Sequence, residues 1–131
     1  MSDVKDGLHY TQSHEWVRQE SDGSVTVGIS DHAQHALGDL VFVEVPEIGR
    51  VLKAGEACAV VESVKAASDV YSPLPGTVIA ANTELSAAAE AVNQDPYGKG
   101  WLWRMRLDGN SGLGQLLDAP GYRKLLAELG E

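Results

Sequence analysis

The sequence predicts a mainly β domain of two packed sheets, with a helix at its C-terminal end. Segments that alternate apolar residues with polar or small ones occupy the first two-thirds of the chain. The pattern PxxGxV occurs at residues 46–51 and again 27 residues later, at 73–78. It is either a chance match among common residue types or a sign of two similar β units, related by an approximate two-fold. The last twenty residues instead space their large apolar side chains at helical intervals.

The first predicted element is a β-hairpin. Residues 24–29 alternate apolar with small or polar side chains, and the Ser-Asp-Gly sequence at 21–23 provides a turn before them. Residues 15–18 are the expected partner strand. The pattern therefore indicates that the sheet begins with these two antiparallel strands.

A short helix is predicted next. Asp31 is the expected N-cap residue, Gln34 follows three residues later as in a capping box, and Gly38 stands where a helix-ending glycine belongs. The chain then returns to β-rich sequence, with strands predicted at 40–45, 56–62, 77–79 and 101–107.

Alternation along two of these strands predicts which side chains share a face. In the strand at 40–45, one face is expected to carry Val41, Val43 and Val45, and the other Phe42. In the strand at 101–107, the apolar face is expected to carry Trp101, Trp103, Met105 and Leu107, opposite Arg104 and Arg106. Both tryptophans are therefore predicted to belong to the core.

The segments after residue 82 are less regular. Residues 86–90 have the composition of a helical turn, and residues 93–98 that of a loop. Pro120 marks the start of a final helix. The apolar face of that helix is expected to consist of Tyr122, Leu125, Leu126 and Leu129, spaced i, i+3, i+4 and i+7.

Length and composition predict a single domain over residues 1–131, with a core at about 8–108 and a C-terminal helical segment at about 113–129. The chain has 10 Lys and Arg against 19 Asp and Glu, a formal net charge of −9 without a basic cluster. This balance argues against a nucleic-acid partner or an anionic membrane surface. We expect a cytoplasmic monomer, since the first ten residues have no features of a targeting peptide and no apolar run is long enough to span a bilayer.

Three side chains that often carry chemistry have plain structural explanations. Cys58 is the only cysteine, which excludes an internal disulfide, and its place in a strand predicts a buried small hydrophobe. His32 and His35 are three residues apart, but no third ligand stands out, so we expect solvated helix residues and no metal site. No nucleophile–base pair, P-loop or dinucleotide fingerprint is present, which argues against an enzyme.

Lys65 is the residue with the clearest chemical potential. Strand-like runs at 58–62 and 68–71 flank it, so it is predicted at the tip of a hairpin. Small residues surround it, which leaves its amine open to the active site of another protein. A tip lysine is ordinarily just a solvated side chain, because an amine with a pKa near 10.4 is rarely deprotonated at neutral pH. An acylating enzyme can nevertheless supply the base and the activated acyl group.

Several motifs resemble the glycine cleavage system H protein family, from about residue 8 to residue 126. They are YxxxHEWV at 10–17, VGISDxAQ at 27–34, LGD at 37–39, VFVExP at 41–46, VESVKAxSD at 61–69 and DPYGxGW at 95–101, with LLD to Tyr122 at the end. The surround of Lys65 is specific, because biotin carriers and 2-oxo-acid dehydrogenase lipoyl domains have other sequences there. The resemblance implies a flattened β-sandwich of the barrel-sandwich hybrid type, which is lipoyl-domain-like with short helices.

The resemblance also implies a function. The lysine at the position of Lys65 bears lipoic acid in amide linkage in this family. The carrier takes an aminomethyl group from glycine decarboxylase (P protein) to the aminomethyltransferase (T protein), and dihydrolipoamide dehydrogenase (L protein) then reoxidises the dithiol. Lipoylating enzymes, either an octanoyltransferase or a lipoate ligase, are further implied partners. The alternatives are a lipoyl or octanoyl relay for 2-oxo-acid dehydrogenases and an unmodified β-sandwich interaction module.

Residues around Lys65 acquire roles from the same resemblance. Glu62, Gly49 and Gly76 match positions that help lipoylating enzymes recognise the carrier. Each glycine is alternatively a turn with positive φ or a close backbone approach, and Glu62 a plain surface acid. Similarity places three further residues, Glu15, Asp69 and Ile29, near a cleft that shields the loaded arm. Their alternatives are an exposed strand-end acid, a turn acid and a core isoleucine.

Overall fold

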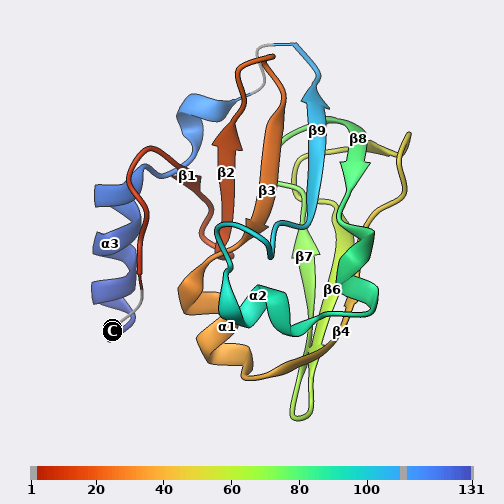
Figure 1. The fold of residues 1–131 in the computed structure, drawn as a ribbon. Coiled ribbons are helices and arrows are strands. Elements are labelled where there is room, and N and C mark those ends of the chain that lie inside the picture. Colours follow the sequence, from red (N-terminus) through yellow and green to blue (C-terminus); the bar gives the residue numbers. More distant parts are fainter. Residues whose placement is uncertain (1–2, 110–111, 131) are drawn as a thin grey trace.

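The computed structural model describes residues 3–109 and 112–130, so residues 1–2, 110–111 and 131 of the predicted domain lie outside the described part. Its strands form two sheets (Figure 1). The larger sheet has the strand order β1 (His9–Tyr10), β2 (Glu15–Gln19), β3 (Val25–Ile29), β9 (Trp103–Leu107), β8 (Gly76–Ala81) and β5 (Val51–Leu52). The smaller sheet has the order β4 (Leu40–Glu44), β6 (Ala57–Ser63) and β7 (Ala67–Tyr71). This confirms the predicted mainly β, two-sheet class.

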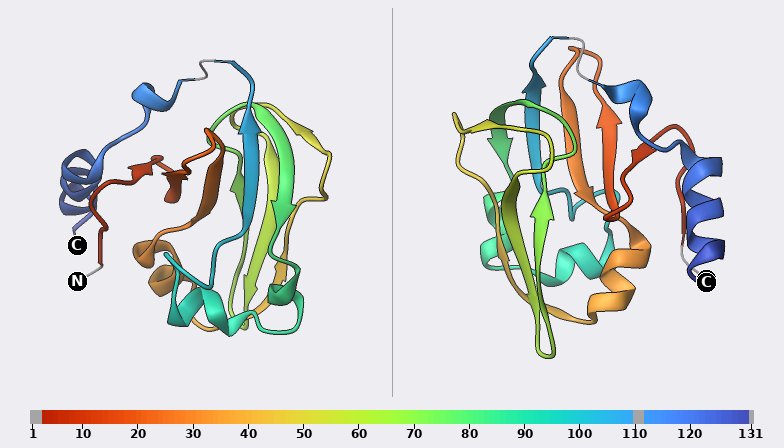
Figure 2. Two further views of the ribbon diagram at one scale, coloured as in Figure 1. Left: turned by 45° about the horizontal axis from the view of Figure 1, so that its top comes forward. Right: turned by 180° about the vertical axis from the view of Figure 1, so that it is seen from behind.

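Helices lie at the ends and the side of this framework (Figures 1 and 2). They are α1 (Asp31–Leu37), the 3₁₀ helix η1 (Thr83–Ser86), α2 (Glu90–Gln94), the 3₁₀ helix η2 (Leu113–Gln115) and α3 (Ala119–Glu128). None of the helices formed by the described residues is both long and apolar enough to cross a bilayer.

Two hydrophobic clusters hold the elements together. The larger one fills the space between the sheets, where Val25, Val27 and Ile29 of β3 are buried and Trp103 and Met105 of β9 face inward as predicted. The smaller one joins β1 and β2 to α3, and its members are Tyr10, Trp16, Ala119, Tyr122 and Leu126. Burial of such side chains contributes roughly 1.5–3 kcal/mol each, so α3 is docked by packing rather than by helix propensity.

The two PxxGxV copies lie side by side and pair with each other. Val51 of β5 faces Thr77 of β8 in an antiparallel register. The Gly49 N–H donates to the Val78 carbonyl at 2.8 Å, and the Val78 N–H donates to the Arg50 carbonyl at 2.9 Å. A local two-fold produces such an antiparallel pair from similar segments, so the repeat corresponds to a structural unit rather than a chance match.

The hairpin of residues 15–18 and 24–29 is confirmed as β2 and β3, but the helix after it begins differently. Ser30, not Asp31, is the N-cap of α1: its backbone is extended and its Oγ accepts from the Ala33 N–H at 3.2 Å. Asp31 is already helical, and its carboxylate accepts from the Gln34 amide at 2.8 Å. Gly38 ends the helix with a φ of 86°, as predicted.

The predicted faces of β4 and β9 need two corrections. Val41 is exposed although Val43 is buried, because a β-bulge between Leu40 and Phe42 shifts the register and breaks the alternation. Trp101 does not share the face of Trp103. It precedes β9, in a turn closed by its N–H to the Gly98 carbonyl, and packs against the smaller cluster.

The irregular region and the last helix also differ from the prediction. Helical structure falls at η1 and α2 rather than at 86–90, and α2 extends to Gln94, inside the predicted loop. Asn82 and Asn93 lie at these elements, and their side-chain amides donate to the distant carbonyls of Lys99 and Gly38, contacts that local sequence does not reveal. In α3, Tyr122 and Leu126 are buried as expected, but Leu129 is exposed because the helix ends at Glu128.

A buried hydroxyl ties α3 to the β2–β3 hairpin. The Tyr122 hydroxyl lies 2.8 Å from Nδ1 of His14 and 2.6 Å from Oγ of Ser30. The ring of Tyr122 stacks on that of Tyr10, with centroids 4.4 Å apart. His14 has a φ of 75°, which is uncommon for a residue with a side chain, and the Ser30 N–H donates to its carbonyl. The hydroxyl therefore fixes the end of the ladder that carries Glu15.

We expect Tyr122→Phe to lower the free energy of unfolding by about 1–3 kcal/mol, because it removes two buried hydrogen-bonding contacts and keeps the stacked ring. Tyr10→Phe is the matched control: it keeps the same stack but loses the bond from its hydroxyl to the Lys5 carbonyl and its contact with the Tyr97 hydroxyl, and it leaves the bonds at Ser30 and His14 in place. Urea unfolding measures both. A loss in Tyr10→Phe equal to or larger than that in Tyr122→Phe would contradict this assignment.

Candidate functional site

Lys65 lies at the tip of the hairpin formed by β6 and β7, as predicted. The last cross-strand pair is Glu62 with Ala67, and Ser63 closes the turn. Its N–H donates to the Ala66 carbonyl at 2.7 Å, and its Oγ accepts from the Ala66 N–H at 3.1 Å. Figures 1 and 2 show the tip extending beyond the other elements. Lys65 is exposed, and its neighbour Val64 is 88% exposed.

Lys65 is therefore exposed on a short, ordered turn, and its side chain lies beside Gly38. Within the part of the chain that the structure describes, no carboxylate forms an ion pair with it. An exposed lysine of this kind can enter the active site of another protein without first breaking an ion pair. This geometry suits an acceptor of an acyl group better than a structural lysine.

Glu15 is a buried carboxylate at the junction of the two sheets, so the alternative of an exposed strand-end acid is wrong. Only 2% of Glu15 is exposed. Its Oε1 accepts from the hydroxyls of Thr11 at 2.5 Å and Ser13 at 2.6 Å, and its Oε2 accepts from the Tyr71 N–H at 3.4 Å. These donors take the place of water, since a buried carboxyl group needs hydrogen-bonding partners.

The three predicted cleft residues lie on neighbouring strands. Ile29 faces Glu15 across the β2–β3 ladder and is buried in the larger cluster, as its core alternative required. Asp69 is exposed on β7, two residues before the Tyr71 amide that Glu15 accepts from. Glu15 thus links the strand of Ile29 to the strand of Asp69. The cleft itself stays a prediction.

Sequence reasoning missed the hydroxyl donors of Glu15. Thr11, Ser13 and Glu15 are spaced i, i+2, i+4, but the residues between them are polar as well, so no alternation in the sequence marked one shared face. The contribution of Tyr71 was not readable, because it depends on how the two sheets pack.

The predicted recognition residues do not form one cluster. Glu62 is half-buried on β6, opposite Phe42 of β4. Gly49 and Gly76 belong instead to the paired repeat of β5 and β8 in the other sheet. Gly49 has a φ of 93° and open space around it, whereas a Cβ at Gly76 would collide with the Arg106 carbonyl oxygen. Gly49 therefore provides a backbone with positive φ, and Gly76 allows a close approach of another backbone segment.

The structure also places the two histidines and the cysteine that the sequence singled out. His35 is exposed and lies 3.5 Å from the Asp31 carboxylate, while His32 is half-buried with its ring 4.6 Å from that of His14. Among residues 3–109 and 112–130, no group of three or more His, Cys, Asp or Glu side chains is placed to hold a metal ion. Cys58 is buried, and burial raises the pKa of its thiol to about 12.

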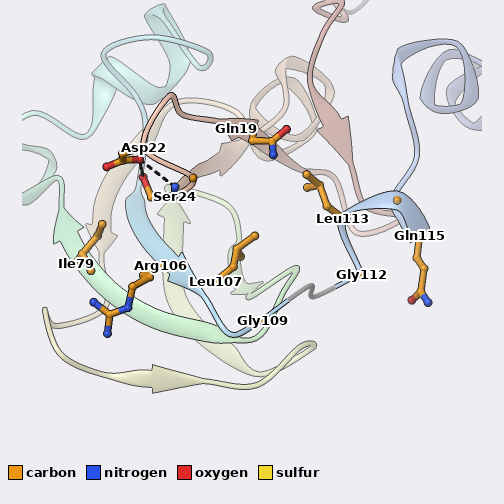
Figure 3. Close-up of a pocket in the computed structure, with 12 residues that line it drawn as sticks. Gln19, Asp22, Ser24, Ile79, Arg106, Leu107, Gly109, Gly112, Leu113 and Gln115 are labelled. Atoms are coloured by element: carbon orange, nitrogen blue, oxygen red, sulfur yellow. Dashed lines mark hydrogen bonds between the residues drawn. The ribbon is translucent and has the colours of Figure 1, made fainter.

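A cavity of about 860 Å³ lies far from Lys65, at the end of the molecule where β2 turns into β3 (Figure 3). Residues of this turn, of β8 and β9 and of the 112–115 segment line it, among them Arg106 and Leu113. Asp22 also lines the cavity. Its carboxylate accepts hydrogen bonds from the backbone N–H and the hydroxyl of Ser24, and these bonds lower the pKa of the carboxyl group. None of the residues that line this cavity belongs to the Lys65 turn.

Comparisons with known proteins agree with one another. The family model described as glycine cleavage H-protein matches residues 8–129. The glycine cleavage system H protein of Alkalilimnicola ehrlichii is 58% identical, over 98% of each chain. That of Halorhodospira halophila is also 58% identical, over 99% of this chain and all of the relative. The crystal structure of a glycine cleavage system H protein from Mycobacterium marinum superposes with a TM-score of 0.84 at 36% identity, covering 98% and 100% of the two chains.

The two recognition glycines should differ in how much stability they contribute. We expect Gly76→Ala to cost about 1–3 kcal/mol or more, since a backbone carbonyl blocks the added methyl group. Gly49→Ala should cost about 1 kcal/mol, from its left-handed backbone alone. Thermal unfolding of both variants measures the difference. A Gly49→Ala variant less stable than Gly76→Ala would refute this reasoning.

The Cys58 thiol should be unreactive in the native protein. At pH 8 a disulfide reagent is expected to find no reactive thiol until guanidinium unfolds the chain, when one appears. The unfolded thiol titrates near pH 8.5 and the folded one near 12, so the unfolded state binds fewer protons between these values. Stability should therefore fall over this range as pH rises, by more in the wild type than in Cys58→Ala. Rapid modification of the native protein would contradict the expectation.

Proposed function

The chain belongs to the glycine cleavage H-protein family, whose members are lipoyl carriers of the glycine cleavage system, and we propose that Lys65 is the residue that carries lipoic acid. The observation that supports this most is the exposed lysine at the tip of a projecting hairpin, within a motif that resembles that of the family. When attached, the lipoyl dithiolane supplies a redox-active acceptor for the aminomethyl group derived from glycine.

The hairpin fits a lipoyl group for two physical reasons. An amide at Nζ removes the positive charge of Lys65, so the modified side chain is a neutral tether with no ion pair to break. A tether also confines its end group to a small volume, which raises the effective concentration at each enzyme that docks. The ordered Ser63–Ala66 turn provides a fixed point from which the arm can move.

We propose three partner enzymes in turn: glycine decarboxylase, the aminomethyltransferase and dihydrolipoamide dehydrogenase. The octanoyltransferase or lipoate ligase that modifies Lys65 is a fourth kind of partner. A net charge of −9 favours rapid, reversible encounters with enzymes that have basic surfaces around their active sites. In this scheme the chain is a carrier subunit and contributes no catalytic residue of its own.

Glu15 and Asp69 are the proposed partners of the cargo, with Ile29 as an apolar neighbour. A buried carboxylate attracts a cationic amine strongly, because water screens the charge poorly there. The hydroxyls of Thr11 and Ser13 hold the Glu15 carboxylate in one orientation, so little reorganisation is needed on binding. Glu62, Gly49 and Gly76 are the proposed recognition residues for lipoylation.

We expect a single lipoyl mass increment on wild-type protein produced in a host that lipoylates its own carriers. Lys65→Ala and Lys65→Arg should lack it and still fold, because a guanidinium cannot be acylated in place of the amine. Lys53→Ala, which removes another lysine from an exposed loop, is the matched control and should keep the increment. Intact-mass measurement checks all four proteins.

If the wild type lacked the lipoyl increment, the carrier proposal would be wrong and the alternative of an unmodified interaction module would remain. Glycine–bicarbonate exchange, reconstituted with glycine decarboxylase, then tests the carrier role of the modified protein. We expect exchange with wild type and none with Lys65→Arg. A lipoylated protein that supports no exchange would instead favour the relay for 2-oxo-acid dehydrogenases.

A further inference from the structure

We propose that Gly38 and Asn93 are positioning residues for the acylation of Lys65, an inference that rests on the proposed function. In that step the Lys65 nitrogen forms a bond to the carbonyl carbon of an activated lipoyl or octanoyl group. The bond from that carbon to its leaving group breaks, and the proton of the nitrogen passes to a base of the acylating enzyme. The two residues act on where the lysine stem lies, and neither takes part in the chemistry.

Gly38 provides a surface of bare backbone against the stem of Lys65. A Cβ at Gly38 would lie 3.3 Å from Cε and 3.9 Å from Nζ of Lys65, so the stem passes over the glycine in close contact. The φ of Gly38 is 86°, a conformation that a side chain also disfavours. Any larger residue would displace the lysine stem, strain the end of α1, or do both.

Asn93 holds this glycine in place from the neighbouring helix α2. Its Nδ2 donates to the Gly38 carbonyl at 2.9 Å and to Oε1 of Gln34, also at 2.9 Å. Its Oδ1 accepts from the Leu40 N–H at 2.8 Å. One side chain thus fixes the backbone on both sides of Asp39, and Gln34, which is buried, adds the last turn of α1 to the same network.

The network reaches the hairpin through the sheet as well as through the lysine stem. Leu40 pairs with Ser63 in the β4–β6 ladder, and Ser63 closes the turn that carries Lys65. Figures 1 and 2 show α1, α2 and β4 at the end of the molecule where the hairpin projects. Asn93 therefore supports Lys65 by two routes, one along the backbone of β4 and one through contact with Gly38.

The consequence is a lysine whose stem is partly ordered before an acylating enzyme binds. A side chain that is already ordered loses less rotamer freedom on entering an active site. Loss of the support should leave the docking surface intact and misplace the nucleophile, so it should lower kcat more than it raises KM.

The test compares matched pairs of variants with purified lipoate ligase, lipoate and ATP, following the mass increment over time. Asn93→Ala is paired with Asn82→Ala. Asn82 is buried, whereas Asn93 is half-buried, and the Asn82 amide likewise makes two hydrogen bonds, to the backbone carbonyls of Lys99 and Trp101, with none to Gly38 or Leu40. Gly38→Ala is paired with Gly55→Ala, which shares the left-handed φ, at 84°, but has open space around it.

We expect Asn93→Ala and Gly38→Ala to lower kcat for acylation at least fivefold relative to their partners, with KM changed by less than twofold. Acylation rates are measured at a temperature well below the thermal unfolding midpoint of every variant. If Asn93→Ala does not fold, the comparison of Gly38→Ala with Gly55→Ala tests the inference. Equal kcat within the pairs, with the wild type acylated normally, would overturn this inference and leave the proposed function standing. A wild type that is never acylated would overturn both.

Discussion

Burial of one face of the β6–β7 hairpin is the interaction on which the exposure of Lys65 depends. Val61 and Val70 lie between the sheets, and each contributes roughly 1.5–3 kcal/mol by leaving water. That packing fixes the base of the hairpin. The turn beyond it has no sheet to cover it, so its residues project into solvent. Lys65 is thus exposed because the strands beneath it are well packed.

The sequence predicted the elements that depend on local periodicity, and it failed where tertiary contacts decide. Strand alternation was sufficient to identify β3, and the β-rich runs on both sides of Lys65 were sufficient to identify β6 and the turn after it. Neither signal could reveal the bulge in β4, which depends on the partner strand and brings Val41 to the surface. Asp31 and Ser30 are both good N-cap residues, and only the Tyr122 hydroxyl, from a helix about 90 residues away, accounts for the place of Ser30.

The candidate site was predictable in a similar, partial way. The family resemblance identified Lys65 and the residues implied around it, and the fold gives those residues different physical roles. Gly49 and Gly76 meet backbone demands in the sheet that does not contain Lys65. A substitution at either glycine is therefore expected to change stability, whatever it does to the proposed recognition by lipoylating enzymes. Glu15 appeared as a strand-end acid in the sequence, and its burial depends on how β2 meets β7.

The single cysteine has a consequence for a protein whose work involves a dithiol. A thiol attacks a disulfide only as an exposed thiolate, and Cys58 is neither exposed nor ionised at neutral pH. Its sulfur points instead to the Val70 carbonyl, inside the small sheet. The chain therefore contributes no competing partner for thiol–disulfide exchange. If Lys65 bears the proposed lipoyl arm, no mixed disulfide can form between Cys58 and that arm in the native protein, and the electrons of the dithiol stay available to a docked enzyme.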